Sequence, residues 1–261
     1  MEKIEKDFLE EIKNNEFKIY VQPKFDIYTQ KIVGGEALIR RIKDNEIIMP
    51  KFFIPEYEKI GIIGKLNIYV FENICKKLKE WKEKGYKLIP ISINESAKDL
   101  YNKSYLDELN KIIKKYEIKP SLIELELTET VVLENIENAK EAEKQVHSLG
   151  FIVSMDDFGV GYSSFSMLRK IEIDVLKIDK SFSDEVLNDE RGRIIIESII
   201  QMAKRLKIKT VAEGIETKEQ VDYLKQIGCD MIQGYYFEKP LPLEEFEEKY
   251  LLFLGTEQKN S

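Results

Sequence analysis

The chain has 261 residues, of which 43% are apolar and 34% charged, enough for one large core in a charge-rich globular protein. Its net charge of −7 argues against a general nucleic-acid-binding surface, so we expect no DNA partner. Two cysteines, Cys75 and Cys229, and one histidine, His147, are too few for the common zinc sites and offer little basis for a Ser-His-Asp triad.

Membrane insertion and secretion are not expected either. No apolar run approaches the roughly 18 residues that cross a bilayer, and the first residues do not form a secretion signal. We therefore expect a cytoplasmic protein with no membrane partner. Any chemistry would rest on carboxylates, amides, lysine and hard cations such as Mg²⁺ or Mn²⁺.

Short apolar, β-branched segments alternate with longer amphipathic segments along the whole chain. The predicted strands are 17–22, 32–38, 88–94, 122–127, 151–155, 175–178, 209–212 and 231–233. The clearest predicted helices are 68–84, 106–116, 136–149, 190–206 and 218–227. This alternation is typical of a mostly parallel α/β sheet, and about eight units in this length favour a (β/α)₈ TIM-type barrel. A doubly wound open sheet is the alternative.

Polar side chains lie within or near the ends of most predicted strands. They are Gln22, Glu36, Asn94, Glu126, Glu129, Asp156, Asp157, Lys177, Asp179, Glu213 and Gln233. Each one alone has an ordinary explanation, such as a helix cap, a turn or a strand-edge charge. Because the carboxyl ends of barrel strands surround one mouth, and unpaired buried carboxylates are costly, the set together predicts a shared site.

The strongest local signal is the pair Asp156-Asp157, which follows an apolar strand and precedes Gly159-Val160-Gly161. Adjacent carboxylates repel each other at neutral pH, so a fold that directs both into one site needs a cation between them. The pair therefore predicts a divalent-metal site. For an isolated Asp-Asp pair, a solvated turn would be the better explanation.

These residues, in this order, resemble the EAL domain family, the cyclic di-GMP phosphodiesterases. The triplet that gives the family its name stands here as Glu36-Ala37-Leu38. The other matches are Gln22-Pro23, Phe53-Ile54-Pro55, Ser92-Ile93-Asn94, Glu126-Leu127-Thr128-Glu129, the loop 156–165, Leu176-Lys177-Ile178-Asp179, Ala212-Glu213-Gly214-Ile215-Glu216 and Gln233-Gly234-Tyr235. The resemblance covers nearly the whole chain, and it implies a (β/α)₈ barrel in which strand 17–22 runs opposite to the rest. We expect one such domain over residues 1–254 and a short polar tail over residues 255–261.

The resemblance also implies a role for each site residue. Two divalent cations, Mg²⁺ or Mn²⁺, are expected. One would be held by Glu36, Asn94, Glu126 and Asp156, and the second by Asp156, Asp157 and Glu213. Lys177 would contact the attacking water, Glu213 would also count as catalytic, and Glu129 would steady the loop after Asp157. Substrate contacts are expected from Gln22, Leu38, Arg40, Asn94, Asp179 and Gln233.

The expected function is metal-dependent hydrolysis of cyclic di-GMP to linear 5′-pGpG by a two-metal mechanism, which lowers the concentration of this second messenger. Paired cations neutralise phosphate oxygens and lower the pKa of water, and a lysine beside them should have a depressed pKa. By the resemblance, the partners would be the substrate and a second copy in a homodimer. We also expect any regulatory partner to act in trans.

Three other functions stay open at this point. The first is a catalytically silent cyclic di-GMP receptor. The second is a Rossmann-type nucleotide site at Gly159-Val160-Gly161, although the third glycine of that motif is missing. The third is an interaction scaffold that uses the charged helix faces, which are more typical of solvated exteriors.

Overall fold

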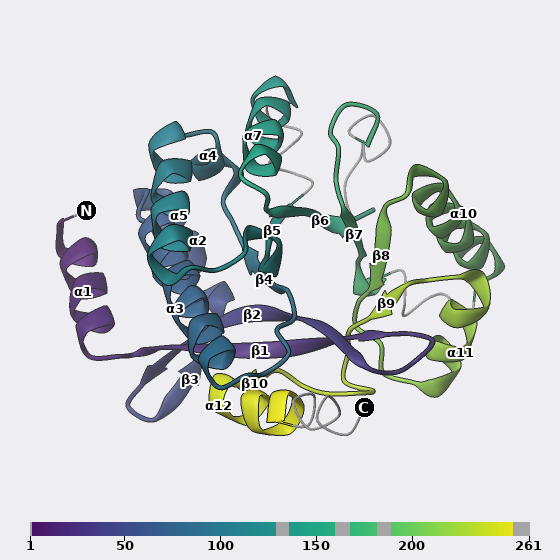
Figure 1. Cartoon of the computed structure of the whole chain (residues 1–261), viewed down its shortest axis with the longest axis horizontal. Helices are drawn as coiled ribbons and strands as arrows, with labels where there is room; N and C mark the ends of the chain where they lie inside the picture. Colours follow the sequence, from purple (N-terminus) through teal and green to yellow (C-terminus); the bar gives the residue numbers. More distant parts are fainter. Residues whose placement is uncertain (1, 129–135, 160–167, 182–188, 253–261) are drawn as a thin grey trace.

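A closed barrel forms the centre of the molecule (Figure 1). The computed structural model describes residues 2–128, 136–159, 168–181 and 189–252. Within these ranges eight strands follow each other around the barrel in the order β1, β9, β8, β7, β6, β5, β4, β2, and β2 pairs back with β1. Their bounds are β1 Phe17–Asp26, β2 Ile32–Lys43, β4 Ile91–Asn94, β5 Ile123–Thr128, β6 Ile152–Phe158, β7 Val175–Ile178, β8 Lys209–Ala212 and β9 Met231–Ile232. The predicted barrel is confirmed, and the alternative of a doubly wound open sheet is wrong.

Strand β1 runs antiparallel to both of its barrel neighbours, β2 and β9, whereas the remaining barrel strands pair in parallel. The predicted reversal of this strand is therefore confirmed. Its predicted end is wrong, because β1 continues to Asp26 and Gln22 lies within it, opposite Glu36. Pro23 does not end the strand because proline removes only one backbone donor, and β2 pairs with β1 on both sides of it.

The helices pack around the outside of the strands, with α10 and α11 beside β8 and β9 and with α3 and α5 on the opposite side (Figure 1). Their bounds are α1 Glu2–Lys13, α2 Ile54–Ile60, α3 Ile63–Glu83, α4 Ala97–Leu100, α5 Lys103–Tyr116, α7 Ile136–Ser148, α10 Glu190–Leu206, α11 Lys218–Ile227 and α12 Leu243–Phe246. Short turns of 3₁₀ helix cover Pro50–Phe52 and Pro120–Leu122, and a π-helical turn covers Glu247–Leu251.

Helix ends follow the capping chemistry. Helices α10 and α11 have their predicted bounds, because Asp189 caps the first and Thr217 forms a capping box with Gln220 in the second. Helix α3 starts five residues before its predicted position of 68, at Ile63. Its N-cap, Ile62, makes no side-chain cap hydrogen bond, so the sequence carries no start signal there.

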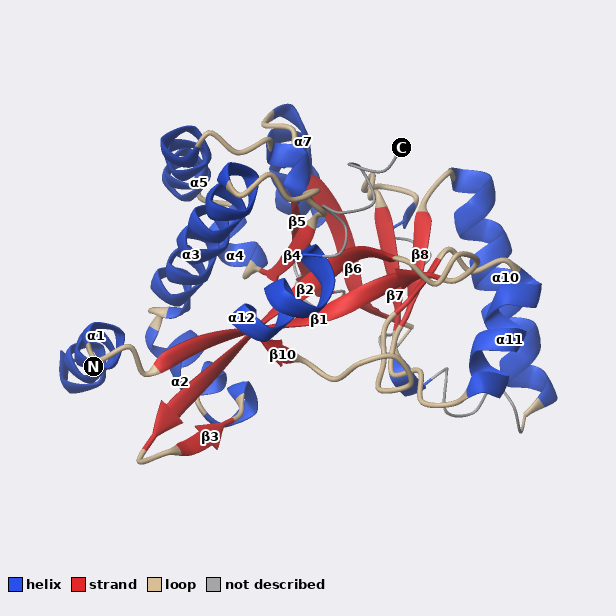
Figure 2. Ribbon diagram, turned by 60° about the horizontal axis from the view of Figure 1, so that its bottom comes forward, coloured by secondary structure: helices blue, strands red, loops and turns tan. Residues whose placement is uncertain are grey.

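Two short strands join the sheet outside the barrel. Strand β3, Glu46–Ile48, forms a hairpin with β2, and β10, Leu241–Pro242, pairs with β1. Figure 2 shows β1 and β2 extending beyond the barrel toward β3 and α1. No helix within the described ranges has the length and apolarity to span a bilayer. The predicted tail, 255–261, lies outside the described residues.

The core includes an aromatic contact and, beside it, a close approach of two strands that depends on a glycine. Phe246 of α12 is fully buried, and its ring centroid lies 6.1 Å from that of Trp81 on α3. A Cβ on Gly35 would lie 2.6 Å from Val21 Cγ1 and 3.4 Å from Phe246 Cζ. Only glycine therefore lets β2 approach these side chains without displacing them.

The single histidine joins α7 to the strand that carries the aspartate pair. Nδ1 of His147 lies 2.6 Å from Glu143 Oε1, and Nε2 lies 2.9 Å from Asp174 Oδ2. Asp174 also accepts a hydrogen bond from Val153 N of β6 at 2.8 Å. Burial alone would lower the pKa of His147, but the hydrogen bonds to Asp174 and Glu143 raise it above its ordinary value.

A raised histidine pKa gives a stability contribution that is complete below the unfolded value of about 6.5 and is lost as pH rises through the folded value. We therefore expect His147→Gln to destabilise the protein more near about pH 6 than near about pH 9. Urea unfolding of both proteins at the two pH values measures this difference. An equal loss of stability at both values would show that protonated His147 is not the stabilising form.

Candidate active site

A buried lysine surrounded by carboxylates lies at the centre of the site. Lys177 of β7 is 1% exposed, and its Nζ lies 2.8 Å from Glu126 Oε2 and 2.9 Å from Asp156 Oδ1. The same nitrogen lies 2.8 Å from Glu213 Oε1 and 3.5 Å from Glu36 Oε2. Side chains from β2, β5, β6, β7 and the end of β8 therefore meet at one point, as the pattern of strand ends predicted.

The two adjacent aspartates reach the site through a break in β6. Successive side chains of a regular strand point to opposite faces, so Asp156 and Asp157 would normally diverge. Here the pairing of β6 with β7 shifts register between Met155 and Phe158, and Asp157 adopts a left-handed conformation with φ 55°. Such strained positions cluster at functional sites.

Carboxylates crowd one another at this site. Burial raises the pKa of Glu36, Asp156 and Glu213, and repulsion from neighbouring carboxylates adds to the effect. The pKa of Glu213 reaches about 8. Burial likewise raises the pKa of Asp157, and Asp179 adds to that rise. A cation placed among these groups would relieve both the burial cost and the repulsion.

For Glu126 and Lys177, attraction between opposite charges outweighs the effect of burial on the pKa. Burial would raise the pKa of Glu126, but the ammonium groups of Lys177 and Lys24 lower it to about 2. Burial would lower the pKa of Lys177, but its carboxylate neighbours, beginning with Glu126 and Glu213, raise it well above its ordinary value. The sequence predicts a depressed pKa for Lys177 when two cations are bound beside it. Without cations, the carboxylates around Lys177 raise its pKa instead.

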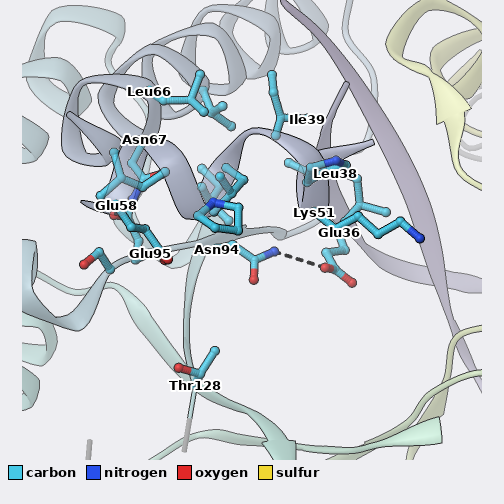
Figure 3. Close-up of a pocket in the computed structure, with 18 residues that line it drawn as sticks. Glu36, Leu38, Ile39, Lys51, Glu58, Leu66, Asn67, Asn94, Glu95 and Thr128 are labelled. Atoms are coloured by element: carbon cyan, nitrogen blue, oxygen red, sulfur yellow. Dashed lines mark hydrogen bonds between the residues drawn. The ribbon is translucent and has the colours of Figure 1, made fainter. Parts of the chain in front are cut away.

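The donor set suits a hard divalent cation. Asp156, Asp157 and Glu213 each offer an oxygen, and these oxygens lie within 4.8 Å of one another. Asn94 Nδ2 donates to Glu36 Oε1 at 3.1 Å, which brings the amide and the carboxylate together (Figure 3). Carboxylate and amide oxygens are the ligands that Mg²⁺ and Mn²⁺ prefer. The residues therefore fit the expected metal.

Comparison with known proteins identifies the family. The family model described as the EAL domain matches residues 5–240. The chain belongs to the EAL domain family.

This EAL domain is 36% identical over 240 residues to the signaling protein YkoW of Bacillus subtilis. It is 32% identical over 246 residues to the cyclic di-GMP phosphodiesterase NbdA of Pseudomonas aeruginosa. The alignments cover 92% and 94% of this chain but 30% and 31% of those proteins, so the chain spans less than a third of their length. A solved structure, the PaMucR phosphodiesterase in complex with c-di-GMP, superposes with a TM-score of 0.87 at 28% identity, covering 94% of this chain and 99% of that one.

Two glutamines of the EAL domain sit beside the carboxylates. Gln233 Nε2 donates to Glu36 Oε2 at 2.6 Å and to Gln22 Oε1 at 3.1 Å. Gln22 Nε2 in turn donates to the carbonyl oxygen of Glu238 at 3.3 Å. Both glutamines that were expected to bind substrate therefore lie at the site, where Gln233 also orients Glu36.

Two other residues expected to contact substrate, Arg40 and Asp179, make their hydrogen bonds with neighbouring backbone groups. Arg40 Nη1 donates to the carbonyl oxygen of Ile39 at 2.8 Å, and its guanidinium carbon lies 5.6 Å from the ring centroid of Tyr20. Asp179 Oδ1 accepts from Ser181 N at 2.8 Å. Glu129 and the loop residues 160–167 lie outside the described residues.

A cavity of about 470 Å³ opens beside Glu36 and Asn94. Leu38 lines it together with mostly apolar side chains of β2, α2 and α3 (Figure 3). Glu95 and Asn67 lie at one side of it, away from Glu36 (Figure 3). The cavity is large enough for a purine base and mostly apolar, as small-molecule sites generally are.

Two charged residues of the EAL domain had no predicted role at the site, Lys24 and Glu95. Lys24 is fully buried inside the barrel, and Glu95 is buried directly after Asn94. The signal for Lys24 was present in the sequence, because it lies two residues after Gln22 and so points to the same face of β1. Glu95 follows the end of β4 and contacts Asn67 of α3 and Tyr105 of α5, so only the packing of those helices reveals its environment.

Proposed function

We propose that this domain hydrolyses cyclic di-GMP to linear 5′-pGpG with the help of two divalent cations, Mg²⁺ or Mn²⁺. The observation that carries the proposal is the meeting of Glu36, Glu126, Asp156 and Glu213 around Lys177 in a chain of the EAL family. Relatives named as cyclic di-GMP phosphodiesterases, such as NbdA, support the same substrate. Activity of this kind would lower the concentration of the messenger.

The chain would hold the cations with the ligands that the resemblance implies. One set is Glu36, Asn94, Glu126 and Asp156, and the other is Asp156, Asp157 and Glu213. When bound, such cations neutralise phosphate oxygens and lower the pKa of an attacking water. Lys177 would keep the ligand carboxylates together and offer N–H donors to that water, because its Nζ is already within 3.0 Å of Glu126, Asp156 and Glu213.

The cavity beside Glu36 would determine where one guanine base of the substrate lies. A phosphodiester placed at the carboxylates would leave one guanine next to the apolar wall that includes Leu38 and Ile39. Burial of a purine face against such a wall would add binding energy. Gln22, Gln233, Arg40 and Asp179 would contact the remaining polar groups of the nucleotide.

The test is incubation of the purified chain with cyclic di-GMP and Mn²⁺ or Mg²⁺, followed by chromatography of the nucleotides. We expect conversion to linear 5′-pGpG that stops when a chelator removes the cations. A protein that binds cyclic di-GMP under these conditions but returns it intact would instead be the catalytically silent receptor. Absence of both binding and turnover would overturn the substrate assignment.

The remaining properties rest on the resemblance and the sequence. We propose one domain over residues 1–254, a homodimer, a regulatory partner acting in trans and a cytoplasmic location. Light scattering of the eluting protein during gel filtration would test the dimer, because a mass near 30.7 kDa would identify a monomer.

A further inference from the structure

A second buried lysine, Lys24, lies inside the barrel and contacts Glu126, as Lys177 does. Lys24 of β1 is 2% exposed, and its Nζ lies 2.9 Å from Ser92 Oγ, 3.0 Å from Glu124 Oε1 and 3.2 Å from Glu126 Oε1. All three acceptors lie on parallel strands β4 and β5, which stand two and three strands from β1 around the barrel. Lys24 therefore crosses the interior and joins the antiparallel strand to the strands that carry expected metal ligands.

The two oxygens of Glu126 have different lysine partners. Oε1 accepts from Lys24 at 3.2 Å, and Oε2 accepts from Lys177 at 2.8 Å. Glu126 is 1% exposed, so neither oxygen is solvated in place of these bonds. The oxygen toward Lys177 faces the cluster that contains Asp156 and Glu213, whereas the oxygen toward Lys24 faces the barrel interior. Lys24 thus fixes the rotation of the carboxylate about its last bond.

The charge of Lys24 is balanced locally. Glu124 precedes Glu126 by two residues on β5, so both side chains point into the barrel, and Glu124 contacts Lys24 more closely than Glu126 does. The pair Lys24 and Glu124 adds no net charge near the site. Beyond the lowered pKa of Glu126 itself, the effect of Lys24 on the site is therefore one of geometry rather than of overall field.

We propose that Lys24 is a positioning residue that holds Glu126 Oε1 in the barrel interior, so that Oε2 alone is presented to a divalent cation. The proposal rests on the metal site of the proposed function. Groups that hydrogen-bond to a metal ligand orient it, and their removal typically costs about 10–100-fold in metal affinity or activity. Without Lys24, Glu126 Oε1 would lose its lysine donor while Oε2 kept Lys177, and the cation would meet a less ordered ligand.

The test is the affinity of the nucleotide-free full chain for Mn²⁺, measured by calorimetry. We expect Lys24→Met to weaken Mn²⁺ binding by about 10–100-fold. The Mn²⁺ concentration for half-maximal turnover should rise by the same factor, while the KM for cyclic di-GMP stays within about threefold. A residue with only a structural role would lower the stability of the chain and leave the Mn²⁺ affinity unchanged.

The single variant leaves Glu124 buried without its cation and can fail to fold for that reason. The double variant Lys24→Met with Glu124→Gln removes both charges, and we expect the same loss of Mn²⁺ affinity from it. The matched control is Lys77→Met on α3, which removes another largely buried lysine, 2.8 Å from Glu247 Oε2 and outside the site. The control should lose stability but bind Mn²⁺ as the parent does.

Failure of this proposal and failure of the metal site give different results. A parent chain that binds no Mn²⁺ would overturn the metal site itself. A parent that binds Mn²⁺, with a folded single or double variant that binds it within about threefold of the parent, would overturn the role of Lys24 alone.

Discussion

Replacing Asp156 by asparagine should lower the turnover of cyclic di-GMP by on the order of 10²–10³-fold, about 3–4 kcal/mol in activation free energy. Asp156 contacts Lys177 at 2.9 Å and is the ligand that both expected cation sets share. Asparagine has nearly the same shape but no negative charge, so the change removes charge and leaves packing in place. Steady-state turnover at saturating Mn²⁺ measures the effect.

Glu36→Ala should give a loss of similar size, because Glu36 is the residue to which both Asn94 and Gln233 donate. A surface control is available in Asp222→Asn, which breaks an exposed ion pair with Lys218 at 2.7 Å on α11. Surface pairs contribute little, so this variant should keep the parent's turnover. Turnover of Asp156→Asn within about threefold of the parent would contradict the metal assignment.

The convergence of the site residues could be predicted from sequence, because the parallel strands of a barrel all end at the same rim. Each parallel strand delivers its last residues to the same rim, so Asn94, Glu126, Asp156 and Lys177 had to approach one another once the strands were assigned. The paired aspartates were equally informative, since repulsion between neighbouring charges is a local property of the sequence. The structure adds the physical means. A register break in β6 and a left-handed Asp157 leave carboxylate oxygens of Asp156, Asp157 and Glu213 within 4.8 Å of one another.

The parts that escaped prediction depend on contacts between segments far apart in the chain. Phe246 of α12 packs beside Gly35 of β2, and nothing in either segment alone indicates the other. Lys24 and Glu124 are 100 residues apart, so their pairing inside the barrel requires the closed fold. A lysine on a strand is ordinarily assigned to solvent. The sequence places Lys24 on the same face of β1 as Gln22, but its partners on β4 and β5 become apparent only in the closed barrel.

Glu95 provides the second large expected effect, on stability rather than turnover. Its side chain is 92% buried between β4, α3 and α5, as its exposed fraction is 8%. Tyr105 Oη donates to Oε2 at 2.6 Å and Asn67 Nδ2 to the same oxygen at 3.4 Å, while Oε1 has no hydrogen-bond partner among the described residues. Burial raises the pKa of Glu95 to about 8, although the hydrogen bonds from Tyr105 and Asn67 oppose the rise.

A carboxyl group whose pKa is higher in the folded state than in the unfolded state stabilises the fold only while it is protonated. Its contribution is complete below the unfolded pKa of about 4.3 and is lost as pH rises through the folded pKa. Between these limits the parent should lose up to roughly 5 kcal/mol of unfolding free energy from this one group, since one pKa unit corresponds to about 1.4 kcal/mol. Burial of an ionised, half-bonded carboxylate is the physical cause.

Glu95→Gln removes the ionisable group and keeps its size, so the variant should lack this part of the pH dependence. We expect it to unfold with about the parent's free energy near pH 5 and to be more stable than the parent by several kcal/mol near pH 9. Urea unfolding of both proteins across that range measures the difference. Glu108→Gln, an exposed change on the same helix as Tyr105, should follow the parent at every pH. Parallel curves for the parent and Glu95→Gln would mean that Glu95 ionises as it does in water, and that the space between α3 and α5 admits solvent.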